Sequence, residues 1–143
     1  MERRLLQIVI GLVACVPILA GGAGVLVGPA LNGVAGASPT AHSHFSYLSG
    51  LLLGIGLCYW SCLPAIERKG ERLGLLTLIV FIGGLGRLFS LFVAGAPSIW
   101  HQGALAIELC VAPAVWLWHR RLAGETEPLI VSLHFGEARK SEA

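Results

Sequence analysis

Charged side chains are scarce in this sequence. Only 13% of its 143 residues are charged, against about 25% in a typical soluble domain, whereas 55% are hydrophobic. The net charge of +2 is too small to indicate a nucleic-acid partner, so we expect none. This balance is typical of the membrane class of proteins.

The sequence also lacks the recognised motifs of catalysis. It has no phosphate-binding glycine loop, no nucleophile elbow and no HExxH arrangement. The four cysteines all lie inside apolar runs: Cys15, Cys58, Cys62 and Cys110. Their placement suggests no solvent-facing disulfide framework and favours buried thiols that act as small hydrophobic groups. The sequence therefore favours a non-enzymatic role and no cofactor.

Two small clusters leave a metal or redox site as an alternative. Cys58 and Cys62 lie one helical turn apart, where redox pairing or metal binding is conceivable. His42, His44 and His101 all lie near the predicted outer ends of helices and would suit zinc. Neither cluster has the spacing of an established metal motif, so we expect no metal.

Four long apolar runs dominate the chain, approximately Leu5–Val27, Phe45–Leu63, Leu73–Ala94 and Ile99–Trp118. Each approximates the ~20 residues that a helix needs to cross ~30 Å of hydrocarbon. They lack the alternation of polar and apolar residues expected of strands in a membrane barrel. We therefore predict an all-α membrane protein with four transmembrane helices in an antiparallel bundle. Residues 1–121 would form this domain, and residues 122–143 would form a cytoplasmic tail.

The basic residues predict the orientation of these helices. Neither the first loop, Gly28–His44, nor the short turn Gly95–Ser98 contains Lys or Arg. Nine of the ten basic residues lie on the other side of a four-crossing arrangement: Arg3, Arg4, Arg68, Lys69, Arg72, Arg120, Arg121, Arg139 and Lys140. Because cytoplasmic loops are enriched in Lys and Arg, both termini should be cytoplasmic. We expect a multi-pass protein of the bacterial inner membrane.

Two ionisable residues, Arg87 and Glu108, fall inside the third and fourth runs. Leaving either charge alone at the bilayer centre would cost roughly 2.5–3.5 kcal/mol. Each lies about ten residues from the Pro97–Ser98 turn, which places both on the order of 15 Å below it. Equal depth on antiparallel neighbours predicts an Arg87–Glu108 ion pair. Its role is either a clamp that fixes helix register or the lining of a ligand site.

Small residues predict close helix packing around this pair and on the second helix. Lipid-embedded helices approach closely where glycine and serine line their contact faces. The candidate packing positions are Gly50, Gly54, Gly83, Gly84, Gly86 and Ser90. The glycines near Arg87 could instead leave room for a ligand.

The run Gly83-Gly84-Leu85-Gly86-Arg87-Leu88-Phe89-Ser90, followed by Gly95-Ala96-Pro97 and Glu108, resembles the DUF4345 family of small bacterial membrane proteins. The resemblance covers about residues 5–121 and implies a four-helix membrane fold without an established activity. Tyr47 stands where that family often has Arg, so a third charge near the pair is not implied. A remote, fold-level similarity to DoxX-like proteins, some of which are tied to quinone or thiol redox systems, is also present.

Three functional hypotheses follow. The leading one is a non-enzymatic bundle that acts through bilayer lipid, another membrane protein or self-association. The second is a redox-associated membrane subunit that binds a quinone-like ligand near Arg87 and Glu108. The third is a proton-coupled transporter component that uses Glu108, although the chain lacks the repeats that transporters show.

Overall fold

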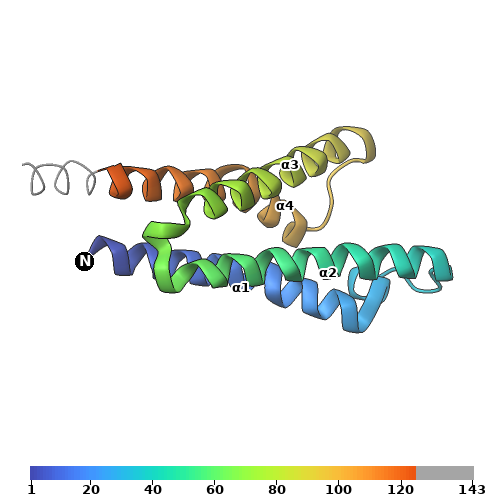
Figure 1. Ribbon diagram of the computed structural model, residues 1–143. Helices are drawn as coiled ribbons and strands as arrows, with labels where there is room; N and C mark the ends of the chain where they lie inside the picture. Colours follow the sequence, from blue (N-terminus) through green and yellow to red (C-terminus); the bar gives the residue numbers. More distant parts are fainter. Residues whose placement is uncertain (125–143) are drawn as a thin grey trace, which may run out of the picture. The chain divides into compact units, whose positions relative to one another are not determined.

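A computed structural model describes residues 1–124, and all regular secondary structure in this range is helical. The all-α prediction is therefore confirmed. The chain divides into two compact units, Met1–Ile66 and Glu67–Ala143, which we call the first and second units. Each unit is built around a pair of antiparallel helices (Figure 1).

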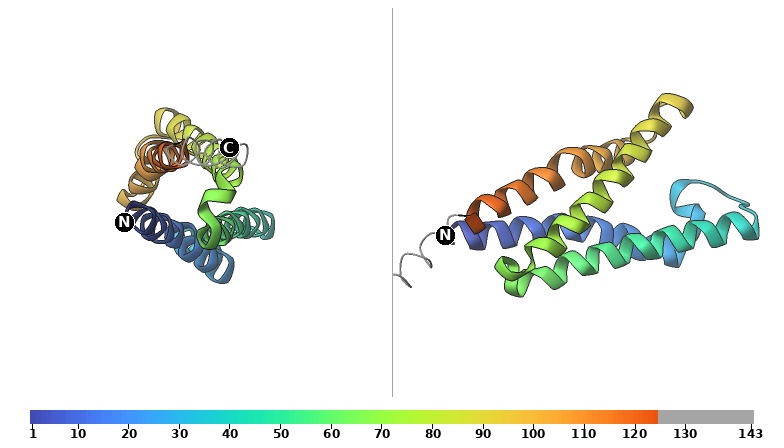
Figure 2. Two further views of the ribbon diagram at one scale, coloured as in Figure 1. Left: turned by 60° about the vertical axis from the view of Figure 1, so that its left-hand side comes forward. Right: turned by 45° about the horizontal axis from the view of Figure 1, so that its top comes forward.

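The first unit consists of α1 (Glu2–Val27), the 3-10 helix η1 (Gly28–Asn32) and α2 (Pro39–Cys62). Gly28 ends α1 with φ of 69°, a conformation that a residue with a Cβ rarely adopts. The 26 residues of α1 extend about 39 Å, enough to cross a bilayer core. The two long helices run side by side in both views (Figures 1 and 2).

Glycines bring the backbones of α1 and α2 together. A methyl group built on Gly21 would lie 2.7 Å from the carbonyl oxygen of Ser49 and would also meet the backbone of Leu53. One built on Gly56 would lie 2.6 Å from Ile18 and 3.2 Å from the Ala14 carbonyl oxygen. The helices therefore touch through backbone at two levels, where only glycine fits without displacement.

Polar side chains near the end of this helix pair find backbone acceptors. Gln7 donates from Nε2 to the Leu63 carbonyl oxygen at 2.7 Å, and Trp60 donates from Nε1 to the Gly11 carbonyl oxygen at 3.1 Å. The first bond connects α1 to Leu63, the residue that follows α2. Gln7 can thus lie in an apolar helix without an unpaired amide donor at that nitrogen.

The second helix begins earlier than the apolar pattern indicates. We predicted its start at Phe45 and a loop over Gly28–His44, but α2 begins at Pro39 and residues 28–32 form η1. Ser38 caps α2, because its Oγ accepts a hydrogen bond from the Ala41 amide at 3.2 Å. Proline at the first helical position fits the same pattern, since its missing N–H is not needed there.

The second unit begins within η2 (Leu63–Lys69), which contains the non-helical residue Ala65, and continues with α3 (Gly70–Ala94). Gly95, with φ of 89°, ends α3. The fourth helix starts as α4 (Ile99–Ala106), widens into the π-helical turn η3 (Ile107–Val111) and continues through residues 112–124. Its start matches the prediction, whereas the π turn was not expected.

Contacts between α3 and the fourth helix fix an antiparallel register. A methyl group on Gly70 would lie 2.9 Å from the His119 ring, and one on Gly74 would lie 2.8 Å from Trp116 Nε1. His119 is buried, and the Arg120 guanidinium lies 5.2 Å from the centre of the Trp116 ring. The right-hand view of Figure 2 shows these two helices side by side.

The long helices present apolar side chains on their outer surfaces. Within residues 1–124, two helical stretches are long and apolar enough to cross a membrane, Glu2–Asn32 and Pro39–Ala94, the second of which contains α2, η2 and α3. Only 22% and 17% of their most apolar segments are buried. A core helix of a soluble protein would be mostly buried. These two stretches could therefore be membrane spans, as the sequence suggested.

Candidate functional site

The structure brings Arg87 of α3 and Glu108 of the fourth helix into contact. Arg87 Nε donates a hydrogen bond to Glu108 Oε1 at 3.0 Å, and the same nitrogen lies 3.0 Å from Oε2. The two oxygens therefore straddle one N–H group. This side-on arrangement differs from a bidentate fork, in which two separate nitrogens each donate to one oxygen.

Several polar atoms of the pair stay without a hydrogen bond. Oε2 of Glu108 is buried and accepts none, although its distance from Arg87 Nε is short. Both terminal nitrogens of Arg87 likewise find no acceptor among residues 67–124 of the second unit. The Arg87 side chain is 37% exposed and that of Glu108 only 15%, so Arg87 is the more exposed partner of the pair.

Two local features set the position of Glu108. It lies in the π-helical turn Ile107–Val111, and such single turns are frequent at functional sites. Opposite this turn lies Gly84, where an added methyl group would meet Glu108 Cβ at 3.0 Å and Leu109 Cδ2 at 2.7 Å. Gly84 therefore lets the π turn approach α3 closely enough for the Glu108 carboxylate to reach Arg87.

Of the predicted packing positions, Gly84 lies at a close helix contact. A methyl group on Gly50 would touch only Val25, at 4.0 Å. Methyl groups on Gly54, Gly83 and Gly86 would have no atom of the described chain within 4 Å, and Ser90 is exposed. Close packing at these positions stays a prediction.

Other positions carry the close contacts that the sequence did not single out. Gly21 of α1 and Gly74 of α3 touch backbone or a tryptophan ring, yet neither was a predicted packing position. Nothing in the sequence distinguishes Gly21 from the adjacent Gly22, which has nothing within 4 Å among the described residues. Which of the two glycines contacts α2 depends only on how α1 is rotated about its own axis.

The cysteine and histidine clusters show no metal-binding arrangement. No group of three His, Cys, Asp or Glu side chains within residues 1–124 is placed to hold a metal ion. Cys62 is buried and Cys58 exposed, and Cys62 Sγ donates to the Cys58 carbonyl oxygen at 3.3 Å. His101 Nδ1 and Ser98 Oγ form a 2.9 Å hydrogen bond at the start of α4. His101 thus has a local hydrogen-bond partner at the start of α4.

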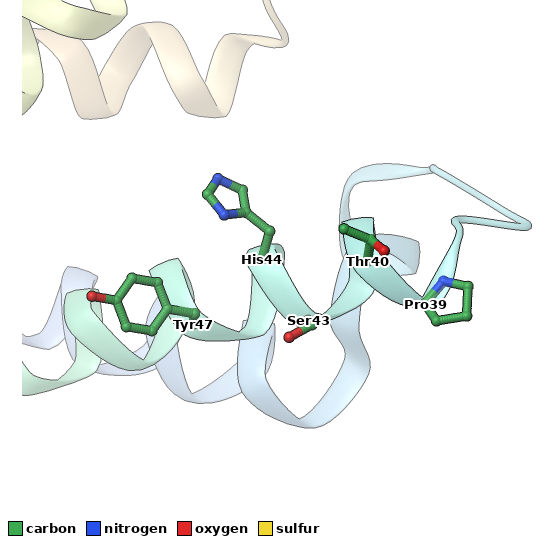
Figure 3. A pocket seen from close by; sticks show the side chains of 5 residues that line it. All are labelled: Pro39, Thr40, Ser43, His44 and Tyr47. Carbon is green, nitrogen blue, oxygen red and sulfur yellow. The ribbon is translucent and has the colours of Figure 1, made fainter.

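A shallow hollow lies on α2, lined by Pro39, Thr40, Ser43, His44 and Tyr47 (Figure 3). Its lining residues all come from the first turns of this single helix, and the hollow is wide open. One helix face supplies no enclosing wall. We therefore place the candidate site at Arg87 and Glu108.

The fold and the pair define a class: an all-α protein with apolar helices of membrane-spanning length and an Arg–Glu ion pair between two of its helices. The chain belongs to the DUF4345 family, a domain of unknown function, whose pattern matches residues 5–119. This match confirms the resemblance seen in the sequence. No curated protein and no solved structure matched the chain.

Proposed function

We propose that this chain is a multi-pass protein of the bacterial inner membrane. In this proposal α1, α2, α3 and the fourth helix cross the bilayer as one antiparallel bundle, with both termini in the cytoplasm. The distribution of basic residues supports this orientation, because the segments around Gly36 and Ala96 contain no Lys or Arg. The low burial of the apolar stretches supports contact with lipid.

The proposed role is binding within the bilayer without catalysis, with lipid, another membrane protein or a second copy as the partner. The observation that carries this proposal is the contact between Arg87 and Glu108 inside the apolar parts of α3 and the fourth helix. Ionisable residues at membrane depth are costly and normally mark either an interhelical contact or a functional site. The pair would hold α3 and the fourth helix in one register and so fix the surface that they present.

Reporter fusions test the topology. Alkaline phosphatase, which is active only outside the cytoplasm, should be active when fused after Gly36 or Ala96. A fluorescent protein that folds in the cytoplasm should be bright when fused after Lys69 or Arg121. The opposite pattern, or recovery of the chain in the soluble fraction, would exclude the proposed arrangement.

Native mass spectrometry of the detergent-purified chain tests the role. We expect bound phospholipid, a second copy or a stoichiometric membrane protein to accompany the chain. A bare monomer, when the topology fusions give the expected pattern, would contradict the binding role but leave the membrane location intact.

A further inference from the structure

The outward edge of the Arg87 guanidinium lacks an acceptor at a depth where water is scarce. Glu108 engages only Nε, and no acceptor from the described residues of the second unit, 67–124, reaches Nη1 or Nη2. In hydrocarbon, polar hydrogens without a partner are costly, because no solvent replaces the missing bond. The Nη1 and Nη2 atoms of Arg87 are thus hydrogen-bond donors without acceptors among these residues, and a ligand that accepts from them would be favoured.

Arg87 cannot readily move this edge to the membrane surface. Long basic side chains near helix ends usually extend toward the interface. Arg87, however, is held at Nε by Glu108. Arg87 lies seven residues, roughly 10 Å, from the end of α3 at Ala94, and Glu108 lies nine residues, roughly 13 Å, from the start of α4 at Ile99. Lipid phosphates and ester groups lie near the interface, so they are poorly placed to reach the pair.

The net charge of the pair limits which kind of compound could bind at the Nη atoms of Arg87. Arg87 and Glu108 together are neutral, so an anion at the Nη edge would leave one uncompensated negative charge in a medium of low dielectric constant. A carbonyl oxygen accepts the same hydrogen bonds and keeps the site neutral. Resting on the proposed membrane location, we infer that Arg87 binds the carbonyl group of a neutral, lipid-soluble compound.

The π turn is a second distinctive feature beside Arg87. Cys110 in the same turn is exposed, Glu108 Oε2 is buried, and Gly84 opposite has no side chain of its own. The Glu108 carboxylate is therefore the more buried partner, and Arg87 is the more exposed one. Glu108 acts as a positioning residue, and Arg87 supplies the donors.

A photoreactive ketone tests the inference directly. The probe is 4-decylbenzophenone, whose carbonyl is both a hydrogen-bond acceptor and the photoreactive group, added to the full chain in phosphatidylcholine nanodiscs. After irradiation, peptide mass spectrometry should place most labelling on α3 and the fourth helix close to Arg87 and Glu108. Excess 4-decylacetophenone should reduce this labelling at least tenfold, whereas excess decylbenzene, which has no carbonyl, should not.

Variants separate binding from folding. Arg87→Met combined with Glu108→Leu removes both charges at similar volume and should lose the localised labelling while keeping its helix content and elution volume. Cys110→Ala, a change in the same π turn, should label as the unmodified chain does. An alkyl diazirine without a carbonyl reports general lipid contact and should label all these variants alike.

Three outcomes would overturn the inference. These are labelling that spreads evenly along the apolar faces, labelling that persists in the double variant, and labelling that decyl phosphate displaces but the ketone does not. The last result would identify an anion site instead. Reversed or soluble topology fusions would refute the proposed function itself, which the labelling pattern alone does not address.

Discussion

The two units of this chain hold their helix pairs together by different means. In the first unit, α1 and α2 meet backbone to backbone at Gly21 and Gly56, without an ion pair at the contact. In the second unit, α3 and the fourth helix meet at an ion pair beside Gly84, and a π turn shapes that contact. The first contact requires glycine, which has no side chain, and the second requires the side chains of Arg87 and Glu108.

In the proposed membrane location, this difference follows from the physics of helix association in lipid. Hydrocarbon removes most of the hydrophobic driving force between helices, so close packing and interhelical hydrogen bonds must supply the affinity. The first unit uses packing, which a single added side chain can disrupt. The second uses a charge pair, which the loss of one partner disrupts more than the loss of both.

The largest effect should come from filling the backbone contact of the first unit. Gly21→Leu places a bulky side chain against the Ser49 carbonyl oxygen and the Leu53 backbone, neither of which can rotate away. Overpacking of this kind should destabilise the helix pair by about 3 kcal/mol. The measurement is the rate at which a maleimide modifies the buried Cys62 in a chain whose other cysteines are alanine.

Gly22→Leu is the matched control, because the added side chain has open space in the described structure. We expect rapid modification of Cys62 in Gly21→Leu and slow modification in Gly22→Leu. Equal rates in the two variants would show that the backbone contact does not hold the first unit together.

The sequence predicted the all-α class and several helix limits in residues 1–124 better than the contacts between the helices. Val27, Ala94 and Ile99 are helix limits in both prediction and structure, because apolar runs end there at Gly or Pro. The start of α2 was missed because the polar residues from Pro39 to His44 were assigned to a loop. Its signal was the Ser38–Pro39 pair, a capping residue followed by proline.

The contacts depend on helix rotation, which an all-apolar sequence specifies weakly. Equal depth from the Gly95–Ser98 turn sufficed to predict that Arg87 and Glu108 would pair, since a charge in lipid has few alternatives. The same reasoning could not choose between Gly21 and Gly22, which differ by one position on the helix. Nor could it foresee a π turn, because no residue type marks one.

An intermediate effect should come from removing one charge in the second unit. Glu108→Leu leaves Arg87 without its acceptor, which should cost about 2 kcal/mol, less than for a fully buried pair because the guanidinium is partly exposed. The double variant Arg87→Met/Glu108→Leu should lie within about 1 kcal/mol of the unmodified chain. Unfolding by sodium dodecyl sulfate in mixed micelles measures the free energy of unfolding of both variants. A double variant less stable than Glu108→Leu alone would indicate that each residue acts independently.

The smallest effect should come from Gly84, where the contact is with side chains and can partly yield. In Gly84→Ala the new methyl group meets Leu109 Cδ2, which can rotate, and Glu108 Cβ, which must shift by a few tenths of an ångström. We expect a loss of about 1 kcal/mol in the same unfolding assay. Gly83→Ala and Gly86→Ala are controls of identical chemistry and should not be destabilised, since nothing in the described chain lies within 4 Å of the added group. If Gly86→Ala were as destabilising as Gly84→Ala, a partner beyond the second unit would have to cover that face of α3. The difference between the two units would then depend on their neighbours as well as on their own helix contacts.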